Sequence, residues 1–262
     1  MSLTANKIDF IIVAHNELPY LKLMLWSLKE HNQDEWNLFE IKVFANNCND
    51  GTKQWCDKHS IWCEDVNLPG VYTTWNYATS ITSNPLIICA SCDYVFAPDF
   101  WKNILKEQQK NPDIYHFTGT CLDNGVMYPH EDNVSVFAWP SPKKMLPTER
   151  RWFKRSCGDN WKEFSYKKFL QAIKEIGTEQ SIRIYESSFS PFLTTRENYN
   201  SIGGFDPLWE YPKPGDLHFL NKMKSMNRKF CIVDAAFWYH FGGKALARRD
   251  DIKYNWKKID EI

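Results

Sequence analysis

The chain has 262 residues, with 32 basic and 32 acidic side chains, and 43% of its residues are hydrophobic. This length fits one large domain, or one domain with a long insert, and the apolar residues suffice for a continuous core. Because the charges balance, no general attraction to nucleic acid arises and we expect no nucleic-acid partner. No apolar stretch reaches the roughly 18 residues that cross a membrane, so any membrane contact would be peripheral.

Aromatic residues make up 16% of the chain, and 12 of them are Trp. They fit a well-filled core, which composition favours, or a site that stacks flat ligands such as sugars. The eight cysteines are not needed as a disulfide framework in a chain this long, and no secretory signal precedes residue 8. We therefore interpret them as reduced thiols of a cytoplasmic protein. Cys89 and Cys92 form a C-x-x-C inside a strand pattern without a second pair, which is weak support for zinc or redox chemistry.

Strand and helix patterns alternate through the first half of the chain. Strands are predicted at 8–14, 39–45, 61–65 and 86–91. Helices are predicted at 18–31, 52–59 and 70–80, and from Pro98 to 111 with Asp99 in the first turn. Strands that alternate with helices across short loops predict an α/β fold with a mostly parallel sheet.

The second half is less regular. Strands are predicted at 114–121 and 134–139, and helices at 161–176 and 217–226. Residues 141–183 hold eleven Lys or Arg and five Asp or Glu. This basic segment is either a solvated face, which is the commoner case, or a lid or acceptor-binding insert.

Polar residues follow the buried strands where those strands end. Asp93 comes directly after the apolar run 86–90, His15, Asn16 and Glu17 follow the first strand, and Asn46 follows the second. Ligands of open α/β sheets bind beyond the carboxyl ends of the strands, so these positions predict a site. The alternative for Asp93 is an ordinary turn residue.

Seven segments in order resemble one known family. They are IIVAHNELPYL, ANNCNDGT, GVYTTWN, SCDYVFAPDFW, TTRENYNSIGGFD, GDLHFLNKM and WYHFGG. Together they resemble the nucleotide-sugar glycosyltransferases of the GT-A fold, family 2 in particular. The resemblance implies a single GT-A domain over 1–262, with a Rossmann-like, mostly parallel sheet and helices on both faces. Residues 1–113 would bind the nucleotide sugar and 114–243 would form a smaller acceptor-side half that contains the basic insert 141–183. Residues 244–262 would be a tail.

The resemblance also implies a divalent metal, Mn²⁺ or Mg²⁺, that neutralises the leaving diphosphate. Asp93 and His240 would be its ligands. The alternative for His240 is a core histidine. Ser91 stands where the family's first Asp-x-Asp carboxylate is usual, so we expect weak binding that depends on the donor. Lys244, Arg248 and Arg249 could neutralise the diphosphate instead.

The same resemblance implies a donor pocket and a base. The residues expected to line the pocket are Ala14, Asn16, Glu17, Asn46, Asn76, Ser91 and Cys92, with uridine as the family default. Trp75 replaces an arginine that is usual before Asn76 and could stack on a ring. Asp216 is the expected general base, although Gly215 replaces the glutamate before it, and Glu210 is the second candidate. The loop 207–215 either carries a sugar-stacking platform or is a surface turn; Asp216 itself could merely cap its helix.

These features predict an inverting glycosyltransferase that moves a sugar from a nucleotide-sugar donor, of the UDP type by family default, to a glycan, a lipid-linked or another hydroxyl acceptor. The alternative is a GT-A-like binding or regulatory protein with weakened catalysis, which the replacements at Ala45, Trp75, Ser91 and Gly215 favour. A nucleotidyltransferase is disfavoured because the start of the chain lacks a Gly-rich, Lys/Arg-bearing loop.

Overall fold

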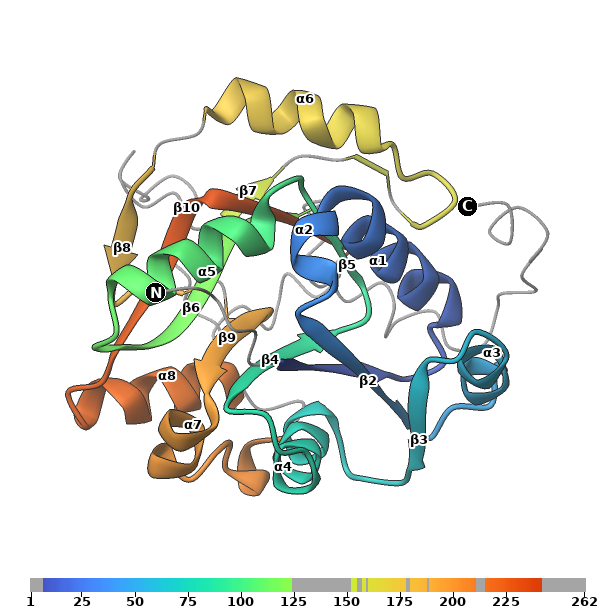
Figure 1. Cartoon of the computed structure of the whole chain (residues 1–262), viewed down its shortest axis with the longest axis horizontal. Helices are drawn as coiled ribbons and strands as arrows, with labels where there is room; N and C mark the ends of the chain where they lie inside the picture. The colour runs from blue at the N-terminus through green and yellow to red at the C-terminus, as the bar shows by residue number, and fades with distance from the viewer. Residues whose placement is uncertain are drawn as a thin grey trace, which may run out of the picture.

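The computed structural model describes residues 7–123, 152–154, 157–158, 160–177, 180–187, 189–210 and 215–241. The predicted strand 134–139 and the residues Lys244, Arg248 and Arg249 lie outside this part of the chain. Within it, one mixed sheet of ten strands runs in the order β3-β2-β1-β4-β9-β6-β10-β5, with β7 on β6 and β8 on β10. Helices flank both faces of this curved sheet (Figure 1).

The first half is the predicted parallel α/β unit. Its strands are β1 (Ile8–Ala14), β2 (Phe39–Asn46), β3 (Trp62–Val66), β4 (Leu86–Ser91) and the short β5 (Tyr94–Phe96). Its helices are α1 (Leu18–His31), α2 (Gln33–Trp36), α3 (Thr52–Lys58), α4 (Val71–Ile81) and α5 (Phe100–Lys110). Strand β1 pairs in parallel with both β2 and β4, and β2 pairs in parallel with β3. The carboxyl ends of all four strands therefore meet at one edge.

The second half continues the same sheet. Its strands are β6 (Ile114–Asp123), β7 (Trp152–Lys154), β8 (Ile182–Ile184), β9 (Phe192–Thr195) and β10 (Lys229–His240). Its helices are α6 (Tyr166–Ile176), α7 (Arg196–Ile202), the 3₁₀ turn η2 (Pro207–Trp209) and α8 (Gly215–Ser225). Strand β9 is antiparallel to β4 and to β6, whereas β10 is parallel to β6 and antiparallel to β5. The pairing of β10 with β5 brings residue 240 beside the residues that follow β4.

Strand β1 is buried on both faces, as its continuous apolar pattern predicts. Phe10 and Ile12 pack in the core beneath α1 and α5, whereas Ile11 and Val13 pack in the core beneath α4, α7 and α8. A third cluster of buried side chains joins α6 to β6 and β10. The helices on the two faces are separate layers in Figure 1.

Strand β10 bulges where it passes β6. Its pairing register shifts between Val233 and Phe237, so three residues leave the ladder. A Cβ on Gly119 of β6 would lie 2.3 Å from the Ala236 carbonyl oxygen and 2.5 Å from the Phe100 ring. Glycine is needed at 119 because the bulge and α5 approach the strand this closely.

Three predicted helices begin at other residues than expected. The helix predicted over 217–226 begins at Gly215 and contains Asp216 in its first turn. Asp99 is not in the first turn of α5 but precedes it, in the left-handed conformation at φ 59°. The helix predicted over 161–176 begins only at Tyr166, because the Ser165 hydroxyl accepts a hydrogen bond from the Lys168 N–H and caps the helix there.

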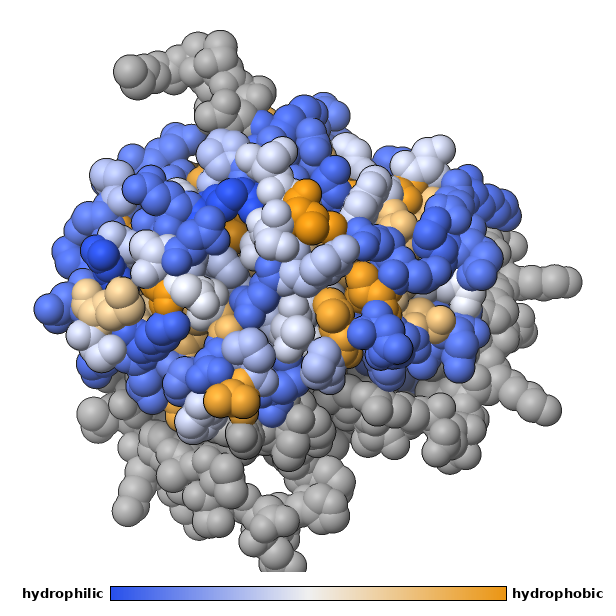
Figure 2. Space-filling model, turned by 90° about the horizontal axis from the view of Figure 1, so that it is seen from below, coloured by the Kyte–Doolittle hydropathy of each residue, from blue (hydrophilic) through white to orange (hydrophobic). Residues whose placement is uncertain are grey.

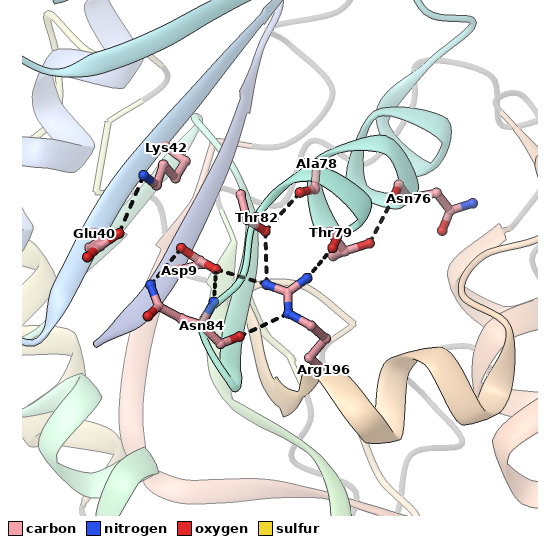
Figure 3. A network of polar contacts seen from close by, with 9 residues as sticks. All are labelled: Asp9, Glu40, Lys42, Asn76, Ala78, Thr79, Thr82, Asn84 and Arg196. Atoms are coloured by element: carbon pink, nitrogen blue, oxygen red, sulfur yellow. Dashed lines mark hydrogen bonds and ion pairs between the residues drawn. The ribbon is translucent and has the colours of Figure 1, made fainter. Parts of the chain in front are cut away.

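A buried polar network ties the two halves together at the edge opposite the carboxyl ends. The Arg196 guanidinium, at the start of α7, pairs with the Asp9 carboxylate of β1 at 2.8 Å. It also donates to the Asn84 carbonyl at 3.0 Å and to the Thr79 carbonyl at the end of α4. Asn84 in turn donates to both Asp9 oxygens (Figure 3). The second half is thus anchored to the first by charge-assisted hydrogen bonds.

Candidate active site

The loops after β1 and β2 hold each other in place. The Asn16 side-chain oxygen accepts from the Asn49 N–H at 2.7 Å, and the His15 ring contacts the Asn46 carbonyl oxygen at 2.6 Å. The Cys48 thiol donates to the Ala14 carbonyl at 3.3 Å. Burial raises the pKa of the Cys48 thiol to about 12, so it stays protonated. Ala14 and Asn16 are thus both at this edge.

Asn46 is 4% exposed and its side-chain amide is used by the protein itself. Its nitrogen donates to the Leu68 carbonyl at 3.2 Å and to the Thr74 hydroxyl at 3.1 Å, and its oxygen accepts from the Leu68 N–H at 2.9 Å. The amide therefore fixes the loop between β3 and α4 against the end of β2.

Asn76 and Trp75 face the interior. The Asn76 oxygen accepts from the Tyr199 hydroxyl at 2.7 Å and from the Phe205 N–H at 3.0 Å, and its nitrogen donates to the Phe205 carbonyl at 2.7 Å. Trp75 is 2% exposed and packs on Phe192 and Phe205. Asn76 thus holds the turn after α7, and Trp75 is a core residue with no free ring face to stack on a ligand.

Asp93 meets His240 at the carboxyl end of β4. The His240 Nε2 lies 3.2 Å from the Asp93 Oδ2, and the Phe241 N–H donates to the Asp93 carbonyl at 3.3 Å. The carboxylate that follows this buried strand is thus paired with the last residue of β10. The Asp93 side chain is 10% exposed and that of His240 is 22% exposed, so both border the solvent.

Glu17 and the two residues before Asp93 line the same edge. The Cys92 thiol is buried and donates to the Glu17 carboxylate at 3.0 Å. Burial, together with the Glu17 and Asp93 charges, raises the pKa of the Cys92 thiol well above its usual range. The Ser91 hydroxyl bonds to that of Tyr94, whose own pKa is raised by burial. Glu17, Ser91 and Cys92 therefore lie around Asp93.

Asp216 reaches this edge from the first turn of α8. The ring of Tyr72 from α4 lies against the preceding residue, Gly215, and the Tyr72 hydroxyl lowers the pKa of the Asp216 carboxyl. Burial raises the pKa of Asp216 to about 6; the Tyr72 hydrogen bond and the positive field of His240 oppose the rise, whereas the Glu210 charge adds to it. Asp216 is near enough to His240 for the positive field of the histidine to act on its carboxyl.

Glu210 follows η2 and caps α4. Its two carboxylate oxygens accept from the Tyr72 N–H at 3.1 Å, the Thr73 N–H at 2.9 Å and the Thr73 hydroxyl at 2.9 Å. A Cβ on Gly70 would lie 2.4 Å from this carboxylate, so glycine leaves room for the cap. A carboxylate at a helix N-terminus also complements the helix dipole.

One face of the Trp209 ring is already covered. His218 stacks on it with ring centroids 4.5 Å apart and an interplanar angle of 12°. The neighbouring Leu208 is 75% exposed. Of the loop 207–215, residues 211–214 lie outside the described part of the chain.

The donor atoms at Asp93 and His240 fit a weakly held divalent cation. A carboxylate oxygen and an imidazole nitrogen that face each other are suitable ligands for Mn²⁺. No group of three or more His, Cys, Asp or Glu that could hold a metal occurs among the described residues. Two protein ligands would leave the remaining positions to phosphate oxygens, as is usual for Mg²⁺ with nucleotides. Cys89 and Cys92 are free, buried thiols.

Sequence reasoning missed Tyr72 and Asp50. The Asp50 carboxylate accepts from the Leu18 N–H at 2.8 Å and the Thr52 hydroxyl at 2.6 Å, which joins the starts of α1 and α3. The turn pattern Asp-Gly-Thr was the available signal for Asp50. No local pattern marks Tyr72, because its partner is 144 residues away along the chain.

A mostly parallel sheet with helices on both faces, and polar side chains at the strand carboxyl ends, matches the GT-A class of fold. The sequence matches Glycosyl transferase family 2 over residues 9–176, more than half of the chain, and the protein belongs to this family.

Two solved structures are similar to this fold. The structure of GalNAc-T7 with UDP, GalNAc and Mn²⁺ has a TM-score of 0.59 and 13% identity, over 89% of this chain and 43% of that one. Residues 1–349 of S. aureus TarS have a TM-score of 0.54 and 16% identity, over 92% of this chain and 62% of that one. This chain thus spans less than two thirds of either structure. No curated protein sequence matches it significantly. In the described part of the chain, no helix has the length and hydropathy required to traverse a bilayer.

Proposed function

We propose that the protein transfers a sugar from a nucleotide-sugar donor, with a UDP-sugar as first candidate, to an acceptor hydroxyl with inversion. The observation that carries this proposal is the pairing of Asp93 with His240 at the carboxyl end of β4, with Asp216 within the electrostatic reach of His240. Membership of Glycosyl transferase family 2 supports the reaction class. The UDP and Mn²⁺ in the GalNAc-T7 structure support the type of donor.

Asp93 and His240 would hold the metal beside the donor diphosphate. When bound there, a divalent cation would neutralise the negative charge that gathers on the leaving group. Asn16, Glu17, Ser91 and the loop ordered by Asn46 would line the donor pocket. The Asn46 amide would hold that loop and would not bind the nucleobase of the donor, because its hydrogen-bonding atoms already have protein partners.

Asp216 would be the general base. The acceptor oxygen forms a bond to the anomeric carbon, the bond from that carbon to the diphosphate oxygen breaks, and the hydroxyl proton passes to the Asp216 carboxylate. A pKa of about 6 leaves Asp216 ionised at neutral pH and makes it a stronger base than an ordinary aspartate. Glu210 is less suited because both of its oxygens cap α4.

We assign the proposed roles to consecutive parts of the chain. Residues 1–113 bind the donor, 114–243 form the acceptor-side half with the basic insert 141–183, and 244–262 form a tail. The acceptor is a glycan, a lipid-linked or another hydroxyl compound. We place the protein in the cytoplasm, with any membrane contact peripheral.

A second candidate is a nucleotide-sugar-binding or regulatory protein with weakened catalysis. The observation that favours it is the Tyr72 ring, which occupies the space beside Gly215 where the related enzymes carry a glutamate: a Cβ at 215 would lie 2.5 Å from that ring. Such a protein would bind the donor without turnover.

The test is the release of UDP from UDP-glucose, UDP-galactose, UDP-GlcNAc and UDP-GalNAc, with Mn²⁺ or with a chelator. We expect slow hydrolysis of at least one donor, lost in Asp93→Ala and kept in Asp113→Ala, which changes an exposed aspartate that pairs with Lys229. Donor binding without any turnover would favour the second candidate, and no binding at millimolar donor would contradict both.

A further inference from the structure

Tyr72 of α4 contacts segments that carry two of the site residues, Glu210 and Asp216. Tyr72, in the first turn of this helix, is held from two sides: its backbone N–H donates to Glu210 at 3.1 Å, and its ring lies against Gly215, directly before Asp216, whose carboxyl is influenced by the Tyr72 hydroxyl. Its ring is buried and stacks on Phe205 with centroids 4.8 Å apart and an interplanar angle of 20°. The residue therefore has little freedom to move.

Two glycines make this arrangement possible. A Cβ on Gly215 would lie 2.5 Å from the Tyr72 ring and from the Trp209 carbonyl oxygen. A Cβ on Gly70 would lie 2.4 Å from the Glu210 carboxylate. Each bare glycine thus lets a side chain from a distant segment approach the backbone, one on either side of Tyr72.

We propose that Tyr72 is a positioning residue for Asp216, and that Glu210 holds the helix end that carries Tyr72. The inference rests on the proposed function, since it assigns a role around the proposed base. A hydroxyl on a rigid ring aims one carboxylate oxygen and leaves the other for the acceptor. Positioning of this kind matters because a misplacement of about 1 Å can reduce a rate by roughly a hundredfold.

The structure supplies a matched control on the same helix. Tyr77 also donates its hydroxyl to a carboxylate, that of Glu64, at 2.6 Å. Tyr72→Phe and Tyr77→Phe therefore each remove from α4 one hydroxyl that acts on a carboxylate, but only the first acts on Asp216. Phenylalanine keeps the ring that packs on Phe205, so both variants should fold.

The first test is UDP release from the nucleotide sugar with the fastest hydrolysis. Tyr72→Phe should lower kcat about ten- to a hundredfold and leave the donor KM within about twofold. Tyr77→Phe should leave both within about twofold. In Asp216→Ala, adding Tyr72→Phe should cause no further loss. Equal kcat in the two Tyr→Phe variants would overturn the inference.

Glu210→Gln distinguishes a role of Glu210 as the cap of α4 from a role as the general base. Glutamine keeps one acceptor for the α4 amides but cannot take a proton, so kcat should fall less than about tenfold if Glu210 is only the cap. A loss of about a hundred- to ten-thousandfold would make Glu210 the base and overturn the inference.

A third measurement needs no turnover. In urea unfolding, the effects of Tyr72→Phe and Asp216→Ala should be coupled by about threefold or more in the unfolding equilibrium constant. Tyr77→Phe and Asp216→Ala should combine without coupling. If the unaltered protein shows no turnover, the proposed function is overturned, and the coupling alone then tests the Tyr72–Asp216 contact. Coupling would support this contact, and absence of coupling would overturn it.

Discussion

At the scale of single residues, the proposed chemistry concentrates in three side chains with different surroundings. Asp93 and His240 face each other at 3.2 Å. Asp216 lies where burial raises the pKa of its carboxyl to about 6. Cys92, beside Asp93, and Asn46, at the end of β2, make hydrogen bonds within the protein. The protein thus separates groups that could react from groups that hold the loops.

The pKa of Asp216 predicts a pH dependence. The rate of UDP release should rise as Asp216 loses its proton, with a midpoint near pH 6. Asp216→Asn should lower the rate about a hundred- to ten-thousandfold and remove this rise. The measurement is kcat/KM between pH 4.5 and 8.5, and a rate that is constant between pH 5 and 7 would contradict the assignment.

The same shift makes a prediction for stability. The folded state holds the Asp216 proton more tightly than the unfolded state, whose pKa is near the ordinary 3.8. The stabilisation from the protonated carboxyl is therefore fully present below about pH 4 and lost as the pH rises through about 6. Asp216→Asn, which stays neutral, should gain stability relative to the unaltered protein between pH 4 and 8. Urea unfolding at pH 4, 6 and 8 measures this difference, and a constant difference would contradict it.

Metal binding should depend on the diphosphate, because two protein ligands fill only part of a coordination shell. Calorimetry should show little heat with Mn²⁺ alone and much more with Mn²⁺ and UDP together, and Asp93→Ala should abolish the difference. Tight Mn²⁺ binding to the free protein would contradict this. UDP binding that neither a chelator nor Asp93→Ala affects would assign the diphosphate to Lys244, Arg248 and Arg249.

At the scale of elements, the site depends on where α4 begins. No side chain of its own caps this helix; the cap comes from Glu210, far along the sequence. The loop before α4 is fixed by Asn46, and the turn after α7 is fixed by Asn76. Segments of both halves are therefore assembled around one helix end.

Gly70 and Glu210 should behave as a pair. Glu210→Ala removes the cap of α4 and should lower the free energy of unfolding by about 1–2 kcal/mol. Gly70→Ala should displace the Glu210 carboxylate and lower the free energy of unfolding by a similar amount. The double variant should be no less stable than Glu210→Ala alone. Urea unfolding checks this, with Glu175→Ala, a change at an exposed residue of α6, as the control. Additive losses would contradict the pairing.

At the scale of the whole molecule, one sheet continues through both halves. The Asp9–Arg196 network closes the edge away from the site (Figure 3). Among the described residues on the face seen from below, hydrophobic side chains appear as small separate spots among hydrophilic ones (Figure 2).

Arg196→Met should destabilise the whole molecule. It leaves the Asp9 carboxylate, which is 1% exposed, without its ion pair and should cost about 3–5 kcal/mol. Lys229→Met, which breaks an exposed pair with Asp113, should cost at most about 1 kcal/mol. Urea unfolding should shift as a single transition if the two halves form one domain. Two separated transitions would contradict that proposal.

The sequence by itself determined the parallel half of the fold. Strand β1 and helix α1 occur where local hydrophobic patterns predicted them, because burial on two faces or along one stripe leaves a clear periodic signal. The position of Asp93 at a strand end, and hence at the edge where ligands bind, follows from the same patterns. The family resemblance, which the match over residues 9–176 confirms, also came from local motifs.

Only the tertiary structure decided the rest, because it depends on contacts between residues far apart in the chain. It showed that Trp75 is core, that the Asn76 side chain holds a turn, and that Glu210 caps a helix 138 residues away. It also found the Tyr72–Asp216 contact, which no local pattern encodes. Hydrophobic periodicity reports which face of an element is buried, but not which distant polar group will satisfy a helix end or set the pKa of a carboxyl.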